Sequence, residues 1–522
     1  MDAPQSQPDP HDAPGSAPSE ALDPIAWLES LAADTARFAA LSEDQRIRLR
    51  RAAGALVYPD RDARKTFVRK KRRIERTRER DHNTAALETT SNRAQKRALR
   101  FPVPPPELAL EPHHRALLEE QASAAPPLPP GRARVLETPR GCYICKADYT
   151  RLHAHYDSMC PSCAELNWLK RHQSADLTGR VALVTGSRVK IGYEICIKLL
   201  RSGARVIATT RFPTDAAERF ALEPDFASFQ SRLVLHGLDL RHTPSVEAFA
   251  QHVLAEETRL DFLIHNACQT VRRPPGFYEH LVEKESDAGL DPKVASLLHS
   301  HRTLLGQMES DQPAGAPTTS LPGLARPAHL SQLDLLGDGP TAHLFPKGVI
   351  DGEGQQLDLR EGNSWRMDLH EVPTVELLEV HLVNAVAPFV LNARLKPLML
   401  AVETPDKHVV NVSAMEGQFY RTFKTTRHPH TNMAKASLNM MTRTSAADYV
   451  RDGIHMNSVD TGWVTDEDPF ERSVRKQTEQ GFAPPLDSVD GAARVLDPIY
   501  TGFLTGVHCW GQFLKDYQPT RW

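Results

Sequence analysis

One stretch of the chain, in which an apolar strand, a glycine-containing turn and a helix follow one another, places the strongest constraint on the fold. Residues 179–212 read GRVALVTGSRVKIGYEICIKLLRSGARVIATTRF. Ile195, Leu199 and Leu200 have the spacing of one helix face, and a second apolar strand follows. The pattern predicts a βαβ unit. Because glycine lets backbone N–H groups approach an anion at a helix N-terminus, the turn is suited to a pyrophosphate.

A series of short motifs gives residues 176–522, apart from one long interruption, a resemblance to a known family. TGSRVKIG keeps Thr185, Gly186 and Gly192 of a T-G-x-x-x-G-x-G pattern, with Lys190 in place of its middle glycine. The motifs GLDLR, IHNAC, HLVNAVAPF, HVVNVSAMEG, NMAKASLN and MNSVDTGWVTDE follow in order. The chain thus resembles the short-chain dehydrogenase/reductase family. The resemblance implies an α/β fold with a doubly wound, Rossmann-type parallel sheet.

The same resemblance implies the residues that bind a dinucleotide and those that take part in the reaction. Asp239 aligns with the residue that contacts adenine, and Thr465 with the one that binds the nicotinamide carboxamide. The expected cofactor-binding residues are Thr185, Gly186, Arg188, Lys190, Ile191, Gly192, Arg211, Asp239, Asn266, Ala267, Lys435 and Thr465. The expected catalytic residues are Asn384, Ser413, Thr431 and Lys435.

The charges near the turn favour NADP over NAD as the cofactor. An NAD-selective site keeps an acid at the end of the second strand to bind the ribose 2′-hydroxyl, whereas this strand ends ATTRF. Arg211 would instead meet a 2′-phosphate. Arg188 and Lys190 add positive charge at the turn, unless they are solvated loop residues.

Two pairs of cysteines precede the βαβ unit. Cys142 and Cys145 form one C-x-x-C pair, and Cys160 and Cys163 form the next. Two such pairs at this separation supply the four thiolates of a closed, tetrahedral site, so we predict a structural Zn²⁺ ion. The module would bind a protein partner or brace the helical segment AELNWLKRHQ against the following domain.

The segment HPHTNMAKASLNM departs from the family at the catalytic position. Lys435 is present, but Thr431 stands where the family has tyrosine, and an alkyl hydroxyl is a poor general acid. The proton could come from His430, Tyr420 or the insertion, or the substrate could accept hydride without strong protonation. Alternatively, the protein binds NADP(H) without turnover and acts as a regulator or scaffold. The retained Ser413 favours an NADP(H)-dependent oxidoreductase with a small-molecule substrate.

The interruption, at about residues 270–370, begins just after the fourth strand of the predicted sheet. Ligands bind at the carboxyl edge of such sheets, so we expect this insertion to wall or cap the substrate pocket. Arg272, Arg273 and Tyr278 would meet an anionic or aromatic substrate or, the interpretation we favour, pin the insertion to the sheet. The segment DQPAGAPTTSLPGLARPAH, residues 311–329, is expected to be disordered.

Composition divides the remaining chain. We expect residues 1–22 to be disordered, 23–100 to be helical and basic, 101–139 to be a proline-rich linker and 140–175 to be the zinc module. The basic run at 64–80 leaves a nuclear address open, but Glu75, Glu79 and Asp81 interrupt it, as on a solvated helix face.

The net charge of −3 offers no field that would recruit nucleic acid or a membrane, so we expect neither partner. We found no secretory signal and no unbroken apolar run long enough to span a bilayer, which favours a cytoplasmic protein. A protein partner would use the zinc module or the N-terminal helices. Family analogy alone suggests a homo-oligomer.

Overall fold

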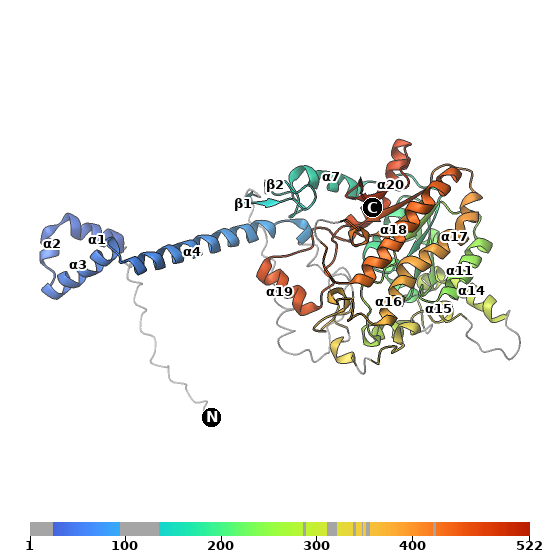
Figure 1. The fold of residues 1–522 in the computed structure, drawn as a ribbon, viewed down its shortest axis with the longest axis horizontal. Coiled ribbons are helices and arrows are strands. Elements are labelled where there is room, and N and C mark those ends of the chain that lie inside the picture. The colour runs from blue at the N-terminus through green and yellow to red at the C-terminus, as the bar shows by residue number, and fades with distance from the viewer. Residues whose placement is uncertain are drawn as a thin grey trace, which may run out of the picture. The chain divides into compact units, whose positions relative to one another are not determined.

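The computed structural model describes residues 24–93, 135–285, 289–310, 321–337, 341–346, 348–350, 355–420 and 424–522 (Figure 1). The chain divides into two compact units, Met1–Arg80 and Asp81–Trp522. The predicted disorder of residues 1–22 and most of the predicted linker at 101–139 fall outside the described residues.

An eight-stranded sheet organises the larger unit. Its strands run in the order β10-β9-β8-β7-β6-β3-β4-β5, and every neighbouring pair is parallel except β9 with β10. The strands are β3 (Val181–Thr185), β4 (Arg205–Thr210), β5 (Leu233–Gly237), β6 (Phe262–His265), β7 (Lys407–Ser413), β8 (Ile454–Asp460), β9 (Phe513–Lys515) and β10 (Gln518–Thr520). The predicted doubly wound parallel sheet is confirmed.

Helices cover both faces of this sheet, which explains why its central strands are apolar at every position. In β3, Ala182 and Val184 belong to one apolar core, and Val181 and Leu183 belong to the other. The first core is closed by α8 (Lys190–Arg201), α9 (Pro213–Ala221) and α20 (Ser488–Thr505). The second is closed by α11 (Thr243–Glu256), α17 (Ala387–Leu400) and α18 (Pro429–Tyr449).

The helix before α17 continues into it with one local distortion. The stretch consists of α16 (Thr374–His381), a π-helical turn η6 (Leu382–Val386) and α17. Among the described residues, Thr374–Leu400 is the one helix whose length and apolar composition would suffice to cross a membrane. Leu391 and Leu395 of this stretch are buried in the second core.

The insertion has regular structure of its own. Its described elements are η2 (Pro275–Phe277), α12 (Glu279–Lys284), α13 (Pro292–Leu297), α14 (His299–Ser310), α15 (Pro322–Ala325), η3 (His329–Gln332), η4 (Ala342–Leu344) and η5 (Ser364–Arg366). Helices α13, α14 and α15 contact the edge strand β5. They therefore protect an edge that would otherwise be open to pairing.

The predicted disorder of residues 311–329 is wrong for its second half, while residues 311–320 fall outside the described residues. Residues 321–329 contain α15, and Leu324 is fully buried in the second apolar core. The segment is rich in proline, alanine and glycine, but burial of one leucine against the sheet is a tertiary interaction that composition does not reveal.

The N-terminal unit is helical, with α1 (Pro24–Ala33), α2 (Thr35–Ala39), α3 (Glu43–Val57) and most of α4 (Arg61–Leu87). Ser42 and Gln45 form a reciprocal capping box at the start of α3. The cysteine pairs lie in the larger unit, in a small module of β1 (Val135–Gly141), β2 (Asp148–Arg151) and α7 (Pro161–His172). Helix α7 contains most of the predicted AELNWLKRHQ helix.

Candidate functional site

The turn between β3 and α8 brings the chain into very close contact with the end of β6. Gly186 has a φ of +71°, which favours glycine, and a Cβ on Gly192 would lie 2.0 Å from Gly186 O and 2.3 Å from Asn266 Nδ2. Asn266 Nδ2 donates to Gly186 O at 3.0 Å, and Ala267 N donates to Thr185 Oγ1 at 3.1 Å. Asn266 and Ala267 thus hold the turn in shape.

The N-terminus of α8 opens from this turn without a side-chain cap. Val189, the N-cap residue, makes no capping hydrogen bond, so the described side chains do not satisfy the first N–H groups of the helix there. Lys190 has a φ of +54°, in the left-handed region where the T-G-x-x-x-G-x-G pattern has glycine. A lysine therefore adopts the backbone conformation that the pattern normally assigns to glycine.

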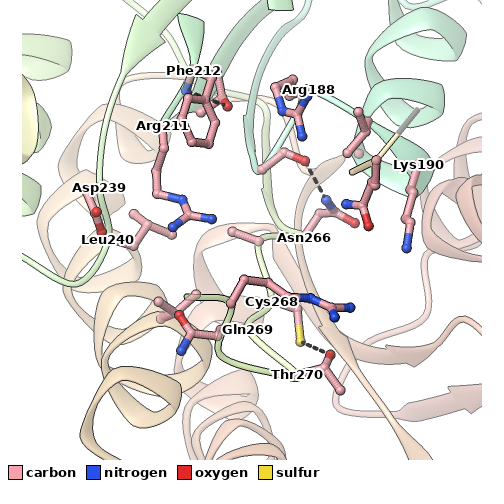
Figure 2. A pocket seen from close by; sticks show the side chains of 18 of the residues that line it. Arg188, Lys190, Arg211, Phe212, Asp239, Leu240, Asn266, Cys268, Gln269 and Thr270 are labelled. Carbon is pink, nitrogen blue, oxygen red and sulfur yellow. Dashed lines mark hydrogen bonds between the residues drawn. The ribbon is translucent and has the colours of Figure 1, made fainter. Parts of the chain in front are cut away.

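A cavity of about 340 Å³ lies at this turn, at the carboxyl edge of the sheet (Figure 2). Its walls come from the turn, the ends of β4 and β5, the segment after β6, the loop after β8 and the insertion. All predicted cofactor residues except Thr185 and Lys435 line it, namely Gly186, Arg188, Lys190, Ile191, Gly192, Arg211, Asp239, Asn266, Ala267 and Thr465. From the insertion, Val271, Arg273, Phe277, Tyr278 and Gln355 line it as well.

Arg211 enters the cavity as a cation with neutral partners. Its Nη1 donates to Ser331 Oγ and its Nη2 donates to Tyr278 Oη, both at 2.9 Å, and its guanidinium carbon lies 4.6 Å from the centre of the Tyr278 ring. No carboxylate among the described residues forms a salt bridge with it. The insertion therefore positions Arg211 without neutralising its charge, and Tyr278 has the pinning role that we favoured.

The other two cations of the turn have different surroundings. Arg188 is buried and forms an ion pair with Asp215 at 2.9 Å, so it is neither a free cation nor a solvated loop residue. Lys190 lines the cavity opposite Arg211 (Figure 2). Of the three positive charges predicted to face a phosphate, Arg188 is the one that forms a salt bridge with a carboxylate among the described residues.

Asp239 is buried at the adenine end that the sequence motif predicts, and it has a strong internal partner. Arg241 Nη2 donates to Asp239 Oδ2 at 2.6 Å, and Arg241 Nη1 donates to Glu379 Oε1 at 3.0 Å. Burial alone would raise the pKa of Asp239, but the hydrogen bonds and charge of Arg241 hold that pKa below its usual value. Asp239 is therefore a fixed carboxylate in the cavity wall.

The sequence motifs did not identify Glu467 as part of this site. It lines the cavity, accepts a hydrogen bond from Thr465 Oγ1 at 2.9 Å and lies 3.8 Å from Arg273. Burial would raise its pKa, but the nearby charges of Lys190 and Arg273 lower it instead. The acidic run DED after Thr465 was the only available signal in the sequence.

The four predicted catalytic residues are all buried next to the carboxyl edge of the sheet. Asn384 lies in the π-helical turn, accepts from Gln269 N at 2.8 Å and donates to Gln269 O at 2.9 Å. Ser413 ends β7, and its hydroxyl has no hydrogen-bond partner in the described part of the chain. Thr431 and Lys435 lie one turn apart on α18, and Lys435 Nζ donates to Val412 O at 2.8 Å. The fold thus brings the three sequence motifs together.

The segment that follows β6 contacts two of these residues, Asn384 and Thr431, and itself lines the cavity. Neither Asn384, Ser413, Thr431 nor Lys435 lines the cavity, whereas Thr270 does. Thr270 O accepts a long hydrogen bond of 3.4 Å from Thr431 Oγ1.

The two alternative proton donors named from the sequence have unfavourable surroundings. Tyr420 is 91% exposed on a loop. His430 is buried, neither ring nitrogen has a hydrogen-bond partner, and burial together with His428 and His381 lowers its pKa to about 4. A histidine with that pKa is neutral at physiological pH, so its remaining N–H is a poor general acid.

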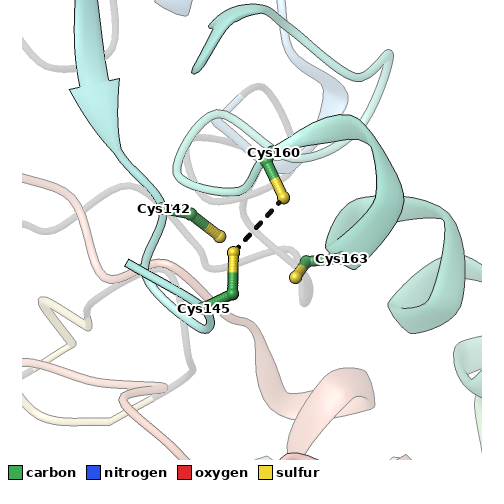
Figure 3. Close-up of side chains that lie close together, drawn as sticks. All are labelled: Cys142, Cys145, Cys160 and Cys163. Atoms are coloured by element: carbon green, nitrogen blue, oxygen red, sulfur yellow. Dashed lines mark hydrogen bonds between the residues drawn. The ribbon is translucent and has the colours of Figure 1, made fainter. Parts of the chain in front are cut away.

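The four cysteines of the module form a compact cluster (Figure 3). The Sγ atoms of Cys142, Cys145, Cys160 and Cys163 all lie within 4.8 Å of one another, and those of Cys145 and Cys160 are 3.6 Å apart. All four are free of disulfide bonds. A nearby group of His155, Asp487 and Asp490 is less suited to metal, because Arg171 already donates to both carboxylates.

Comparison with protein families matches two consecutive parts of the chain. Residues 180–325 match the model described as short chain dehydrogenase, and residues 361–480 match the one described as Enoyl-(Acyl carrier protein) reductase. Uncharacterized protein R665 of Acanthamoeba polyphaga mimivirus is 32% identical over 373 residues, which are 69% of this chain and 71% of R665.

Other relatives match over shorter stretches. Retinol dehydrogenase 11 of Mus musculus is 38% identical over 112 residues, 21% of this chain and 35% of that protein. Retinol dehydrogenase 12 of Bos taurus is 33% identical over 31% of this chain and 49% of its own length. The chain therefore matches less than half the length of each of these two dehydrogenases.

Solved structures with a similar arrangement include two with a bound dinucleotide. The Pseudomonas aeruginosa RhlG/NADP complex aligns at a TM-score of 0.40 and 16% identity, covering 65% of this chain and 95% of RhlG. The NADPH-bound carbonyl reductase from chicken fatty liver aligns at 0.39 and 18% identity, covering 66% and 100%.

The neutral state of His430 predicts a pH dependence of stability. Because its pKa is lowered from 6.5 to about 4, the unfolded chain takes up a proton below pH 6.5 that the folded chain does not, and stability is lost as the pH falls. Among the described residues, the carboxylate of Glu376 lies 3.9 Å from His430 Nε2. His430→Gln removes this proton uptake. Between about pH 7 and about pH 5, the free energy of unfolding of the variant should therefore fall by up to about 2 kcal/mol less than that of the wild type.

Thermal unfolding at the two pH values measures this difference. Met433→Gln, at an exposed position of the same helix, is the matched control and should leave the pH dependence unchanged. An identical pH dependence in wild type and His430→Gln would show that His430 is not held neutral by burial.

Proposed function

Because this chain belongs to the short-chain dehydrogenase family, we propose that it is an NADP(H)-dependent oxidoreductase that acts on a small molecule. The observation that carries the proposal is the position of Arg211. An unneutralised guanidinium follows β4, and it lines the same cavity as the glycine turn and the uncapped N-terminus of α8. This combination suits a dinucleotide that carries a 2′-phosphate in addition to its pyrophosphate.

The residues present fit such a cofactor. The glycines at 186 and 192 allow the close turn, and the first N–H groups of α8 have no side-chain cap. Arg211 and Lys190 would hold the phosphates, while Thr465, from the loop after β8, would hold the nicotinamide end. When bound, the cofactor would supply or accept hydride at its nicotinamide ring.

The protein's own contribution to the reaction would come from the buried cluster beside the cavity. Ser413, whose hydroxyl lacks a partner among the described residues, would orient the group of the substrate that accepts hydride. Lys435 would contact the nicotinamide ribose, and Asn384 would hold the segment at Gln269 in place. Substrate access would require the segment around Thr270 to move away from Thr431.

Proton transfer would not depend on Thr431 as a strong acid. The hydroxyl of Thr431 is far less acidic than the phenol that it replaces, and His430 is neutral. We therefore propose a substrate, such as an iminium or a conjugated system, that accepts hydride without strong protonation of an oxygen atom.

A second candidate is an NADP(H)-binding regulator or scaffold that does not turn over. One observation favours it: the hydrogen bond from Thr431 to Thr270 closes the catalytic cluster off from the cavity. Such a protein would bind its cofactor and keep the cluster as part of the wall.

We also propose that the four cysteines bind one structural Zn²⁺ ion. Four thiol sulfurs within 4.8 Å of one another, two of them from each C-x-x-C pair, match the donor set of a closed tetrahedral site. The two-stranded sheet of this module is too small to be stable by itself, so a metal would supply much of its stability.

The first test compares the affinities for NADPH and NADH. We expect NADPH to bind more tightly, and Arg211→Ala to remove most of that preference by deleting a charge-assisted contact worth about 1.5 to 3 kcal/mol. Arg201→Ala, which removes an exposed arginine paired with Asp225, is the control and should preserve the preference. Equal affinities for the two cofactors in the wild type would refute the assignment to NADP(H).

The second test separates an enzyme from a binding protein, using loss of NADPH absorbance with a panel of carbonyl, iminium and conjugated compounds. Thr431→Val should leave turnover nearly intact, whereas Ser413→Ala should lower it by about 100-fold or more. If the wild type turns over nothing and Thr431→Tyr creates carbonyl reduction, the protein is a cofactor binder.

The third test is metal analysis of the purified protein. We expect one equivalent of zinc, and its loss in Cys142→Ser or Cys160→Ser because removal of one thiolate opens the site. Cys509→Ser, at a cysteine remote in sequence from both pairs, should retain the metal. Folded, zinc-free wild-type protein with four reactive thiols would eliminate the zinc site.

A further inference from the structure

The cysteine module and the cofactor cavity share one apolar core. Cys142, Met159 and Cys160 are buried in a cluster that also contains Val464 and Leu486, and Ile191 packs against it. Val464 precedes Thr465, which lines the cavity, and Ile191 is itself a cavity residue of the β3–α8 turn. The module therefore contacts both segments that would hold the pyrophosphate and the nicotinamide.

One polar contact joins the first C-x-x-C pair to the loop after β8. Tyr143, the residue after Cys142, accepts a hydrogen bond at its Oη from Trp463 N at 3.0 Å. Gly462 makes this approach feasible: its φ is +75°, and a Cβ at that position would lie 3.2 Å from Tyr143 Oη. The loop and the tyrosine therefore fit each other closely at the point where the loop leaves β8.

The position of Tyr143 depends on the cysteine pairs. It lies between Cys142 and Cys145, and its backbone N donates to Ser158 O at 2.8 Å, two residues before Cys160. A metal bound by all four sulfurs would fix both ends of this short segment. Without a metal, a few backbone hydrogen bonds, such as Cys142 N to Ala147 O at 2.9 Å and Tyr143 N to Ser158 O, and the surrounding apolar contacts would have to do so.

A second set of contacts holds the module on the N-terminal end of α20. Tyr156 Oη donates to Asp490 at 2.6 Å, and Arg171 donates to Asp487 at 2.6 Å. Further along α20, Gly491 packs on Ile191, because a Cβ there would lie 2.8 Å from Ile191 Cγ1. These buried contacts do not involve the cysteines, so the module would stay attached when the metal is removed.

We propose that metal binding by the four cysteines is coupled to dinucleotide binding through Tyr143 and the loop after β8. With the metal bound, Tyr143 holds Trp463 in place, and Thr465 and Glu467 stay at the cavity wall. Without it, the segment from Cys142 to Cys145 is released, the loop loses its support, and the affinity for the dinucleotide falls. The inference rests on the zinc site and the NADP(H) site proposed above.

Linkage makes this coupling reciprocal, because two ligands that stabilise the same arrangement must strengthen each other equally. The dinucleotide should therefore raise the affinity for zinc by the same factor by which zinc raises the affinity for the dinucleotide. A module that only braces the fold, with no effect on the loop, would show no such reciprocity.

The experiment measures the Kd of the full-length protein for NADPH, with zinc bound, after chelation and after zinc is added back. We expect the Kd to rise about tenfold on chelation and to recover on re-addition, within the range of typical coupling energies. In the reverse direction, competition with a chromophoric chelator should show zinc bound about tenfold more tightly when NADPH is saturating. Circular dichroism establishes that the chelated protein remains folded.

Two tyrosine variants, both measured with zinc bound, localise the coupling and do not depend on the stability of the chelated protein. Tyr143→Phe should keep its zinc but raise the Kd for NADPH about threefold to tenfold, as expected for one lost hydrogen bond. Tyr149→Phe is the matched control, because its hydroxyl donates to Asp157 O inside the module, and it should bind NADPH like the wild type.

The measurements distinguish failure of the zinc site, failure of the NADP(H) site and failure of the coupling between them. Wild-type protein without zinc refutes the metal site, and wild-type protein without NADPH binding refutes the proposed function; either result also overturns the coupling. If both ligands bind but the Kd for NADPH is the same with and without zinc, or the same in Tyr143→Phe and wild type, the coupling alone is wrong.

Discussion

The close approach of the β3–α8 turn to the end of β6 is the contact on which the rest of the site depends. Gly192 has no room for a side chain beside Gly186 O and Asn266, and the hydrogen bonds of Asn266 and Ala267 hold the turn against β6. With that geometry fixed, the uncapped N-terminus of α8 points its N–H groups into the cavity, and Arg211 arrives from the next strand. These positive groups give the carboxyl edge of the sheet the charge that the proposed phosphorylated cofactor requires.

The insertion adds contacts at the cavity, at the edge of the sheet and at the start of α18. Its first segment lies between the cavity and the catalytic cluster, Tyr278 and Ser331 position Arg211, and its later helices cover the edge strand β5. Its last segment stacks Trp365 on His428, with ring centres 4.0 Å apart, at the start of α18. This one inserted region therefore positions a cation of the cavity, forms part of the cavity wall and contacts the start of the helix that carries Thr431.

The secondary structure and the family motifs could be predicted from the sequence, because both are set by short stretches of neighbouring residues. The alternation of apolar strand and amphipathic helix predicted the βαβ unit, and the family resemblance carried by the short motifs implied the parallel sheet and the grouping of Asn384, Ser413 and Lys435. Features that depend on distant partners could not be predicted in this way. The pairing of Arg188 with Asp215, the burial of Leu324 and the low pKa of His430 all arise from residues that only the folded chain brings together.

Transfer of hydride between a nicotinamide and a small molecule is the central claim. The most direct test uses NADPH that carries deuterium at the carbon that donates hydride. The full-length protein is incubated with this cofactor and a panel of carbonyl, iminium and conjugated compounds. Mass spectrometry of the products then reports whether the label has moved. The account predicts a product that carries one deuterium, and its loss in Ser413→Ala. Tight NADPH binding with no deuterium in any product would contradict it.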